Sequence, residues 1–415
     1  MRPFFENNVL QQQPFKPMII VVDTTKAGSA SNTFVLPIIK DTTETVKIYW
    51  GDGTNSMGVN GDNTHVYAAS GIYTVKIESR LFGGIYFNNL GDKAKITKIA
   101  NYGQGVSRLN IGSFYGCSSL LSIDIGNIVS NGADASNQYR GCTSLTTVPL
   151  FNLSSVTNAG GMLYQCTSLT TVPLFNLSSV TNAGSMFLGC TALTTVPLFN
   201  LSNCTSTQAM LYQCSNITTV PLFDLSKVTN ASYMFYQCTA LTTVPLFDLS
   251  NLINATGMLY QCSKLTTVPL FNLSNCTNTW SMFAYCTSLT TVPLFNLSSV
   301  TYAYTMFYQC TALTTVPLFD LSKVTNASYM FYQCSSLMSV PLFDLSSVTN
   351  ASNMFSGVTL TTQSYSDFLI NLATLPLQSG VSFHGGNSKY NPAAAIARAY
   401  LVSNFGWTIT DGGAA

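Results

Sequence analysis

The chain has 415 residues, a formal net charge of +1 and only 8% charged residues. That length allows two or three domains, and so small a charge excludes the basic surface that nucleic acids or acidic membranes attract. The mean hydropathy is +0.26, but the sequence has no run of about 18 apolar residues, so we expect no membrane insertion.

Residues 1–16 are predicted to form an N-terminal arm. They lie in the stretch MRPFFENNVLQQQPFKP, where no charged segment is followed by an apolar one, so we expect no secretory signal peptide. The arm is interpreted as a segment that docks on a larger particle, and a frayed chain end is the alternative.

Residues 17–104 are predicted to form a β-sandwich. Short alternating segments such as MIIVVDTT, TVKIYWGDG and IYTVKIES are separated by turn residues, as in two packed sheets. No polar linker follows this domain, so we expect a fixed junction with the next part of the chain.

This first domain resembles Ig-like modules of the PKD type. The residues that carry the resemblance are Trp50, Gly51, Asp52, Gly53, His65, Tyr67, Gly71 and Tyr73. The resemblance implies that these residues are structural, and that the module is a spacer or binding unit and not an enzyme.

Residues 105–358 are predicted to form a solenoid. A unit of 24 residues, whose first 22 positions follow the pattern L-T-T-V-P-L-F-[ND]-L-S-x-V-T-N-A-x-x-M-[FL]-Y-Q-C, recurs in nine copies. Leu145, Val148 and Leu150 follow the L-x-x-L-x-L spacing of leucine-rich repeats. One coil cannot bury its own apolar side, so the coils must stack on one another.

Within a coil, we expect a short strand over LTTV that ends at the proline, because proline lacks the N–H that a ladder needs. The MFYQC segment is expected to form a turn of helix on the opposite wall, with Met and Phe inward. The residue after LF and the TN pair would supply the turns.

The twelve cysteines are interpreted as a column of reduced, buried thiols. Nine of them, from Cys142 to Cys334, recur every 24 residues. Cys204 and Cys276 stand where other coils carry valine, so the thiol replaces a small apolar side chain. A disulfide framework or a zinc site fits less well, since the sequence has no C-x-x-C pair or Cys/His cluster.

The repeat is similar to the BspA-like leucine-rich repeats of bacterial surface proteins and of some phage structural proteins. The stretches KVTNASYMFYQCTALTTVPLFDLS and SVTNASNMFSG carry this resemblance, through the pattern V-T-x-x-x-x-M-F-x-x-C-x-x-L. It implies a leucine-rich-repeat solenoid displayed on a surface.

Residues 359–415 are predicted to form a small α/β cap, which also resembles the module that often follows such repeats. Helices are expected over SYSDFLINLA and NPAAAIARAYLVSNF, and strands over SGVSFHGG and GWTITDGG. The predicted fold is therefore mainly β with short helical turns: a PKD-type Ig-like sandwich, a solenoid of 24-residue repeats and an α/β cap.

The sequence predicts no catalytic, cofactor-binding or metal-binding residue. Its two histidines, His65 and His384, lie in different domains, and His65 is expected to hydrogen-bond to the GDG turn. Asp52, Asp62 and Asp92 are expected to serve in turns, because no D-x-D-x-D-G calcium loop surrounds them.

The two positions before each repeated Met vary between coils, and they define a candidate partner-binding stripe. Aromatic side chains bury a large area at a low cost in conformational entropy, so variable aromatics on a constant scaffold indicate a contact surface. Sequence drift at exposed positions is the alternative. The stripe consists of Tyr233, Trp280, Tyr302, Tyr304 and Tyr329.

These features favour a non-enzymatic phage virion surface or fibre protein. It would bind a host surface protein or glycan through the solenoid, and other virion proteins through the arm or the PKD-like domain. A virion protein needs no signal peptide and keeps its thiols reduced. A bacterial cell-surface adhesin of the same repeat family is the alternative, and homo-oligomers are compatible with either. An enzyme is a third reading, which lacks any catalytic constellation.

Overall fold

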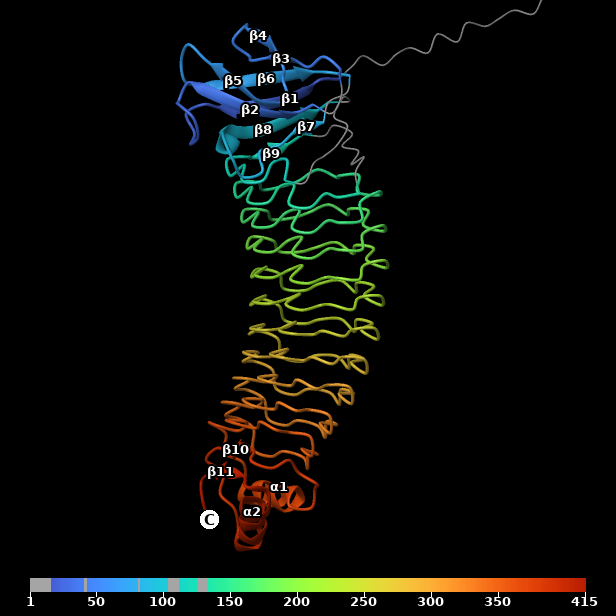
Figure 1. Cartoon of the computed structure of the whole chain (residues 1–415), viewed down its shortest axis with the longest axis vertical. Helices are drawn as coiled ribbons and strands as arrows, with labels where there is room; N and C mark the ends of the chain where they lie inside the picture. The colour runs from blue at the N-terminus through green and yellow to red at the C-terminus, as the bar shows by residue number, and fades with distance from the viewer. Residues whose placement is uncertain (1–15, 41–42, 81–82, 104–111, 125–132) are drawn as a thin grey trace, which may run out of the picture.

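A computed structural model describes residues 16–40, 43–80, 83–103, 112–124 and 133–415. The molecule is elongated, with a β-sandwich at one end, a long stack of coils and a small α/β cap at the other end (Figure 1). The predicted arm lies outside the described residues, apart from Lys16.

The N-terminal part consists of two sheets, as expected for a sandwich. One has six strands in the order β4-β3-β6-β1-β8-β9, and the other has three in the order β5-β2-β7. Alternate side chains of β1 and β2 are buried, which is the pattern of strands with one face on a core. The strands are β1 (Met18–Asp23), β2 (Thr33–Ile39), β3 (Lys47–Tyr49), β4 (Asn55–Met57), β5 (Gly61–Val66), β6 (Ile72–Glu78), β7 (Gly84–Ile85), β8 (Ile96–Tyr102) and β9 (Ser122–Ile123).

The sandwich and the solenoid form one continuous structure. Strand β9 belongs to the first coils of the repeat region, yet it pairs in parallel with β8 of the sandwich sheet. The backbone N–H of Phe87 also donates to Ser113 O at 3.0 Å, and the hydroxyls of Tyr102 and Tyr139 are hydrogen-bonded in the core. The junction is therefore fixed by a shared sheet and a shared core.

A buried ion pair holds one corner of the sandwich together. Lys95, in the 3-10 helix η1 (Lys93–Lys95), lies 3.6 Å from Asp92, and both side chains are almost fully buried. The ammonium donates to Thr33 O at 2.6 Å, and the carboxylate accepts from the N–H of Val35 at 2.7 Å. Asp92 therefore does more than the turn role expected of it, because its carboxylate binds a segment that is distant in the sequence.

The coils stack mainly through hydrogen bonds on one of their two walls. We call the L-T-T-V-P-L-F segment of each coil the first wall and the N-A-x-x-M-[FL]-Y-Q-C segment the second wall. On the second wall, alternate N–H groups donate to the next coil: Ala159 to Asn182 O at 2.9 Å and Leu163 to Met186 O at 2.9 Å. Single-residue parallel bridges at the Asn position run from coil to coil along the stack.

Two local predictions for the coil are wrong. In the nine regular repeats the first wall forms no strand; several pairs of adjacent coils share one backbone bond there, such as Thr194 N–H to Thr170 O at 3.3 Å. The second wall is not a turn of helix but a series of overlapping i→i+3 turns. Its residues before Met and before Cys have positive φ, 56° at Tyr329 and 55° at Gln333, which a right-handed helix cannot accommodate.

The leucine-rich-repeat spacing holds for only part of the first wall. Leu145 and Val148 are buried, but Leu150 is 63% exposed and Phe151 is buried in its place. In the next coils the N–H of each such Phe donates to the carbonyl of the Pro two residues before it, as Phe175 does to Pro173 at 2.9 Å. This tight turn after the proline directs the aromatic ring inward and the preceding leucine outward.

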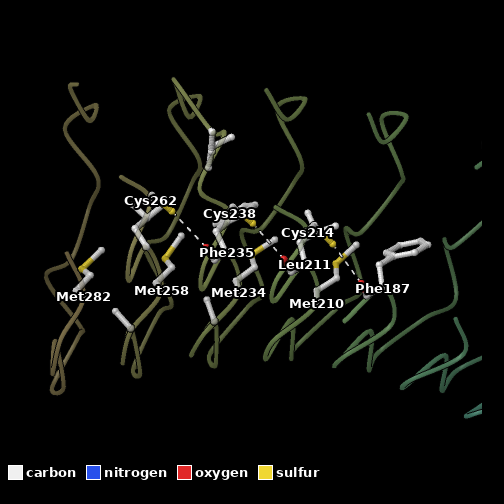
Figure 2. Packing of buried hydrophobic residues seen from close by; sticks show 14 of the residues in the cluster. Phe187, Met210, Leu211, Cys214, Met234, Phe235, Cys238, Met258, Cys262 and Met282 are labelled. Atoms are coloured by element: carbon white, nitrogen blue, oxygen red, sulfur yellow. Dashed lines mark hydrogen bonds between the residues drawn. The ribbon is translucent and has the colours of Figure 1, made fainter. Parts of the chain in front are cut away.

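Columns of like side chains fill the interior, as predicted for Met, Phe and Cys. The Met210, Met234 and Met258 side chains follow one another beside the thiols of neighbouring coils (Figure 2). Each thiol from Cys142 onward donates to a carbonyl of the preceding coil, as Cys238 does to Leu211 O at 3.1 Å. All twelve cysteines are free and buried.

The C-terminal cap has the predicted elements: α1 (Thr362–Leu372), β10 (Ser382–His384), α2 (Pro392–Phe405) and β11 (Thr408–Thr410). Asn391 caps α2 by accepting the Ala394 N–H at 3.0 Å, with Pro392 at the first helical position. Strands β10 and β11 pair in parallel, and Val358 fills the column position of the missing last cysteine.

Candidate binding surface

The local backbone of the second wall fixes the conformation of the variable positions. The Asn of the TN pair accepts the N–H two residues later, as Asn278 does from Trp280 at 2.9 Å, which fixes an Asx turn. The residue before Met then takes a left-handed φ: 54° at Ser281 and 53° at Thr305. The Met that follows is buried, and the exposure of the two residues before it differs between coils: Trp280 is 44% exposed, whereas Thr305 is 8% exposed.

A column of tyrosines runs along the same wall, two positions after the Met in six of the nine repeats. Tyr212 and Tyr236 stack with ring centroids 4.4 Å apart, and Tyr236 and Tyr260 stack at 4.3 Å. Tyr308 and Tyr332 continue the column at 4.8 Å. The variable stripe therefore lies beside a continuous ladder of aromatic rings.

The coil around Trp280 departs from this ladder and opens a notch in it. Its sequence WSMFAYC places Ala284 where neighbouring coils carry tyrosine, and Tyr285 where they carry glutamine. The ring of Tyr285 is tilted by 60° to that of Tyr260, with centroids 5.2 Å apart. An open pocket of about 350 Å³ results, lined by Tyr260, Trp280, Ser281, Ala284, Tyr285, Tyr304, Thr305, Tyr308 and Tyr329. We call this pocket the aromatic notch.

The structure brings four of the five predicted stripe residues together at this notch. The rings of Trp280 and Tyr304 lie 6.0 Å apart, and those of Tyr304 and Tyr329 lie 5.9 Å apart. Tyr302 stands where most coils carry the Asn of the TN pair. Together with Trp280 and Tyr304 it lines an adjoining hollow of about 430 Å³. Trp280 and Tyr302 remain 44% and 55% exposed, so their rings are open to contact.

Tyr233 is the stripe residue that lies apart from the notch. Its ring packs against Tyr236 at 5.8 Å and across Gly257 of the next coil. A Cβ at Gly257 would come within 2.7 Å of that ring, so this glycine leaves room for it. Tyr233 therefore lies back on the wall, in the way that the drift alternative expects of some rings.

None of the nine residues that line the aromatic notch is charged at neutral pH. Burial, together with the neighbouring tyrosine hydroxyls, raises the pKa of Tyr260 well above its ordinary value, and burial likewise raises the pKa of Tyr308. Polar groups are still present: the hydroxyls of Ser281 and Thr305 lie 2.6 Å apart at the notch. The notch thus combines aromatic faces with neutral hydrogen-bonding groups.

Reasoning from the sequence missed the residues that create the notch. Ala284 and Tyr285 belong to positions that carry Tyr and Gln in six of the nine repeats, so they do not stand out as variable positions. The available signal was the exchange of YQ for AY, which occurs in one of the nine copies. The contribution of Tyr260 and Tyr308 could not be read from the sequence, because both have the residue type of most other coils.

The histidines and acidic residues have structural surroundings. His65 Nε2 lies 2.8 Å from Asp52 Oδ2, which confirms the predicted bond to the GDG turn, and its ring stacks on Trp50 at 4.8 Å. His384 Nδ1 accepts the Gly386 N–H at 3.0 Å. Asp62 lies within strand β5, so the expected turn role is wrong for this residue. In the described ranges, no group of three or more His, Cys, Asp or Glu could hold a metal ion.

Fold and surface together define the class: a repeat solenoid that carries a local aromatic notch. The family described as "Mycoplasma protein of unknown function, DUF285" matches residues 133–244, 171–269 and 254–368, which together span more than half of the chain. The chain belongs to this family, which assigns it no catalytic activity. In the part of the chain that the structure describes, neither helix is long and apolar enough to cross a membrane.

The repeat region is also similar to leucine-rich-repeat proteins of known structure. One, from Bacteroides ovatus, is 15% identical with a TM-score of 0.40, and the match covers 79% of this chain and 95% of that one. Another, from Eubacterium ventriosum, is 15% identical with a TM-score of 0.31, over 63% of this chain and 83% of that one. These likenesses carry no argument about function. Among curated proteins, none matches this chain. The PKD-type resemblance of the first domain stays a prediction.

Proposed function

We propose that this protein is a non-enzymatic, bacterial cell-surface adhesin that binds a neutral glycan in the aromatic notch. The observation that carries the proposal is the break in the tyrosine column at Ala284, between Tyr260 and Tyr308, which opens a pocket of about 350 Å³ walled by aromatic rings. A repeat scaffold supplies a rigid site without any contribution from mobile loops.

The chemistry of the notch favours a sugar over a charged ligand. The apolar C–H face of a pyranose ring packs well against the flat faces of Trp280 and Tyr304, which offer large apolar area with little entropy to lose. Sugar hydroxyls can exchange hydrogen bonds with the Ser281 and Thr305 hydroxyls. A carboxylate or phosphate would find no cationic partner among the lining residues.

The choice of the bacterial surface rests on the family match and on the repeat resemblance. The virion-fibre interpretation depended on the N-terminal residues, which are not among those that the structure describes, and the family match does not favour it. Immunolabelling of intact cells distinguishes the two locations, since an adhesin is exposed on the cell and a virion protein co-purifies with particles.

A gap-filling substitution tests the glycan site. Ala284→Tyr restores the residue that most coils carry, so it should fold normally while closing the notch. Leu188→Tyr is the matched control, because it places the same residue at the same position of a different coil. The full-length protein is applied to a printed array of neutral and sialylated oligosaccharides, and titration calorimetry follows with the best neutral binder.

We expect the native chain and L188Y to bind with equal affinity and A284Y to bind at least tenfold more weakly. Absence of any neutral binder on the array would refute the glycan proposal. Equal binding by A284Y would move the site away from the notch.

A further inference from the structure

A continuous apolar stripe runs along the first wall of the solenoid. It consists of the leucine that follows the proline of each coil, and eight of these nine leucines are 57–63% exposed while the last is 47% exposed. We call this set the leucine stripe: Leu150, Leu174, Leu198, Leu222, Leu246, Leu270, Leu294, Leu318 and Leu342. The interior gains nothing from these side chains, because the adjacent phenylalanines fill the core.

The exposed area of the stripe matches the apolar part of an interface. At about 25 cal/mol per Å² and roughly 1.5–3 kcal/mol for a fully buried leucine, a whole leucine side chain corresponds to roughly 60–120 Å². Because eight of the nine leucines are 57–63% exposed, each offers roughly 35–70 Å², and the nine together offer roughly 300–600 Å². That is the size of the largest apolar patch on a typical monomer, which is often functional. A standard interface buries about 800 Å² on each partner, of which a little more than half is apolar. The leucine stripe can therefore supply the apolar part of a protein–protein interface.

The stripe lies on the wall opposite the aromatic notch. Phe199 of the first wall stacks on Phe187 of the second wall with ring centroids 5.8 Å apart, so both rings point into the core. Leu198 precedes the first of these rings and Leu188 follows the second, and each faces outward from its own wall. A partner on the stripe would leave the notch accessible.

We propose that the leucine stripe is the interface between two copies of this chain. A partner that contacts all nine leucines must present apolar groups with the same spacing as the coils. A second copy of this chain has that spacing, because each of its coils carries one such leucine. The first walls of the nine repeats contain no charged residue, so two of them can approach without burying an unpaired charge. A two-fold dimer also buries the same patch on both subunits.

The oligomeric state tests this proposal directly. Sedimentation equilibrium of the full chain in reductant should show a concentration-dependent dimer. The triple variant L222S/L246S/L270S should raise the dimer dissociation constant at least tenfold while its far-UV spectrum stays native. The matched control is W280S/Y304S, which removes exposed aromatic area from the opposite wall and should dimerise as the native chain does.

A cross-link supplies a second, independent readout. Leu246 is the fifth of the nine leucines, so an in-register two-fold pairing places it against its own copy. Leu246→Cys should therefore be linked into dimers by a short bis-maleimide, because its thiol is exposed while the native thiols are buried. Gln208→Cys, exposed on the opposite wall, should give none.

Three results would overturn the proposal. These are a native chain that stays monomeric at about 100 µM, a triple-serine variant that dimerises as tightly as the native chain, and equal cross-linking of L246C and Q208C. Binding of a monomeric chain to phosphatidylcholine vesicles would assign the stripe to a lipid surface instead. Because the notch lies on the other wall, each of these results leaves the glycan proposal standing.

Discussion

The buried thiol column should make the solenoid unusually sensitive to alkaline pH. Burial raises the pKa of Cys238 from 9.0 to about 12, and the same cause gives about 12 for three further thiols: Cys190, Cys286 and Cys334. Between pH 9 and 12 an unfolded thiol is ionised while a folded one keeps its proton. The unfolded state then binds fewer protons, so stability falls as the pH rises through this window.

The size of the effect follows from the pKa difference. At pH 10, one unit above the ordinary thiol pKa, each of the four thiols lowers the free energy of unfolding by about 1.4 kcal/mol, or about 6 kcal/mol together. That is comparable with the total stability of a typical domain, about 5–15 kcal/mol. The column should therefore dominate the loss of stability in alkali.

Urea unfolding at pH 8, 9 and 10 in a non-thiol reductant measures this loss. The reference is C190V/C238V/C286V/C334V, in which valine takes the place that Val358 already occupies in the last coil with no exposure. Tyrosines and lysines titrate alike in both proteins, so the difference isolates the thiols. The native chain should lose about 6 kcal/mol more than the variant between pH 8 and 10; equal losses would refute the reasoning.

The sandwich yields two further predictions. Burial opposes ionisation of Asp52, but hydrogen bonds from Thr54 and His65 hold its pKa at about 2. The stability that ionised Asp52 contributes is therefore present above pH 3.8 and is lost as the pH falls towards 2. Acid titrations followed by Trp fluorescence should show this loss in the native chain and not in D52N. Identical titration profiles of the two proteins would contradict the prediction. Lys95→Met should destabilise the sandwich by about 3–5 kcal/mol because it leaves Asp92 buried without its counter-ion. The control K98M breaks the exposed pair of Lys98 and Asp124, which lie 2.7 Å apart, and should change the free energy of unfolding by at most about 1 kcal/mol; equal effects of the two substitutions would argue against a buried charge.

Much of the fold could be predicted because the apolar residues that form the core recur at fixed positions of the repeat. The 24-residue period identified the solenoid, and the exchange of Cys204 and Cys276 with valine identified a buried column. Local signals were equally informative at the cap, where Asn391 and Pro392 marked the start of α2. These features depend on residue type and spacing alone, which is why the sequence carries them.

The coil's conformation could not be predicted from the same pattern. The L-x-x-L-x-L spacing suggests that Leu150 is inward, yet Leu150 is exposed and Phe151 takes its place in the core. The MFYQC segment suggests a turn of helix, but paired left-handed residues such as Tyr329 and Gln333 break any helix. The turn that directs the phenylalanine inward lies within a coil, as in the bond between Phe175 and Pro173, whereas the second wall is also bonded to the next coil, as Tyr329 N–H is to Ser352 O at 2.9 Å. Residue spacing alone does not specify these bonds.

The sequence by itself determined the period, the columns and the aromatic character of the variable positions, since each follows from residue type at a fixed spacing. Only the tertiary structure decided which aromatics meet. It gathered Trp280, Tyr302, Tyr304 and Tyr329 around the gap at Ala284 and left Tyr233 lying on Gly257. It also decided that nine leucines stand outside the core. The physical reason is stacking: the exposure of a side chain in a coil depends on what the coils above and below place beside it.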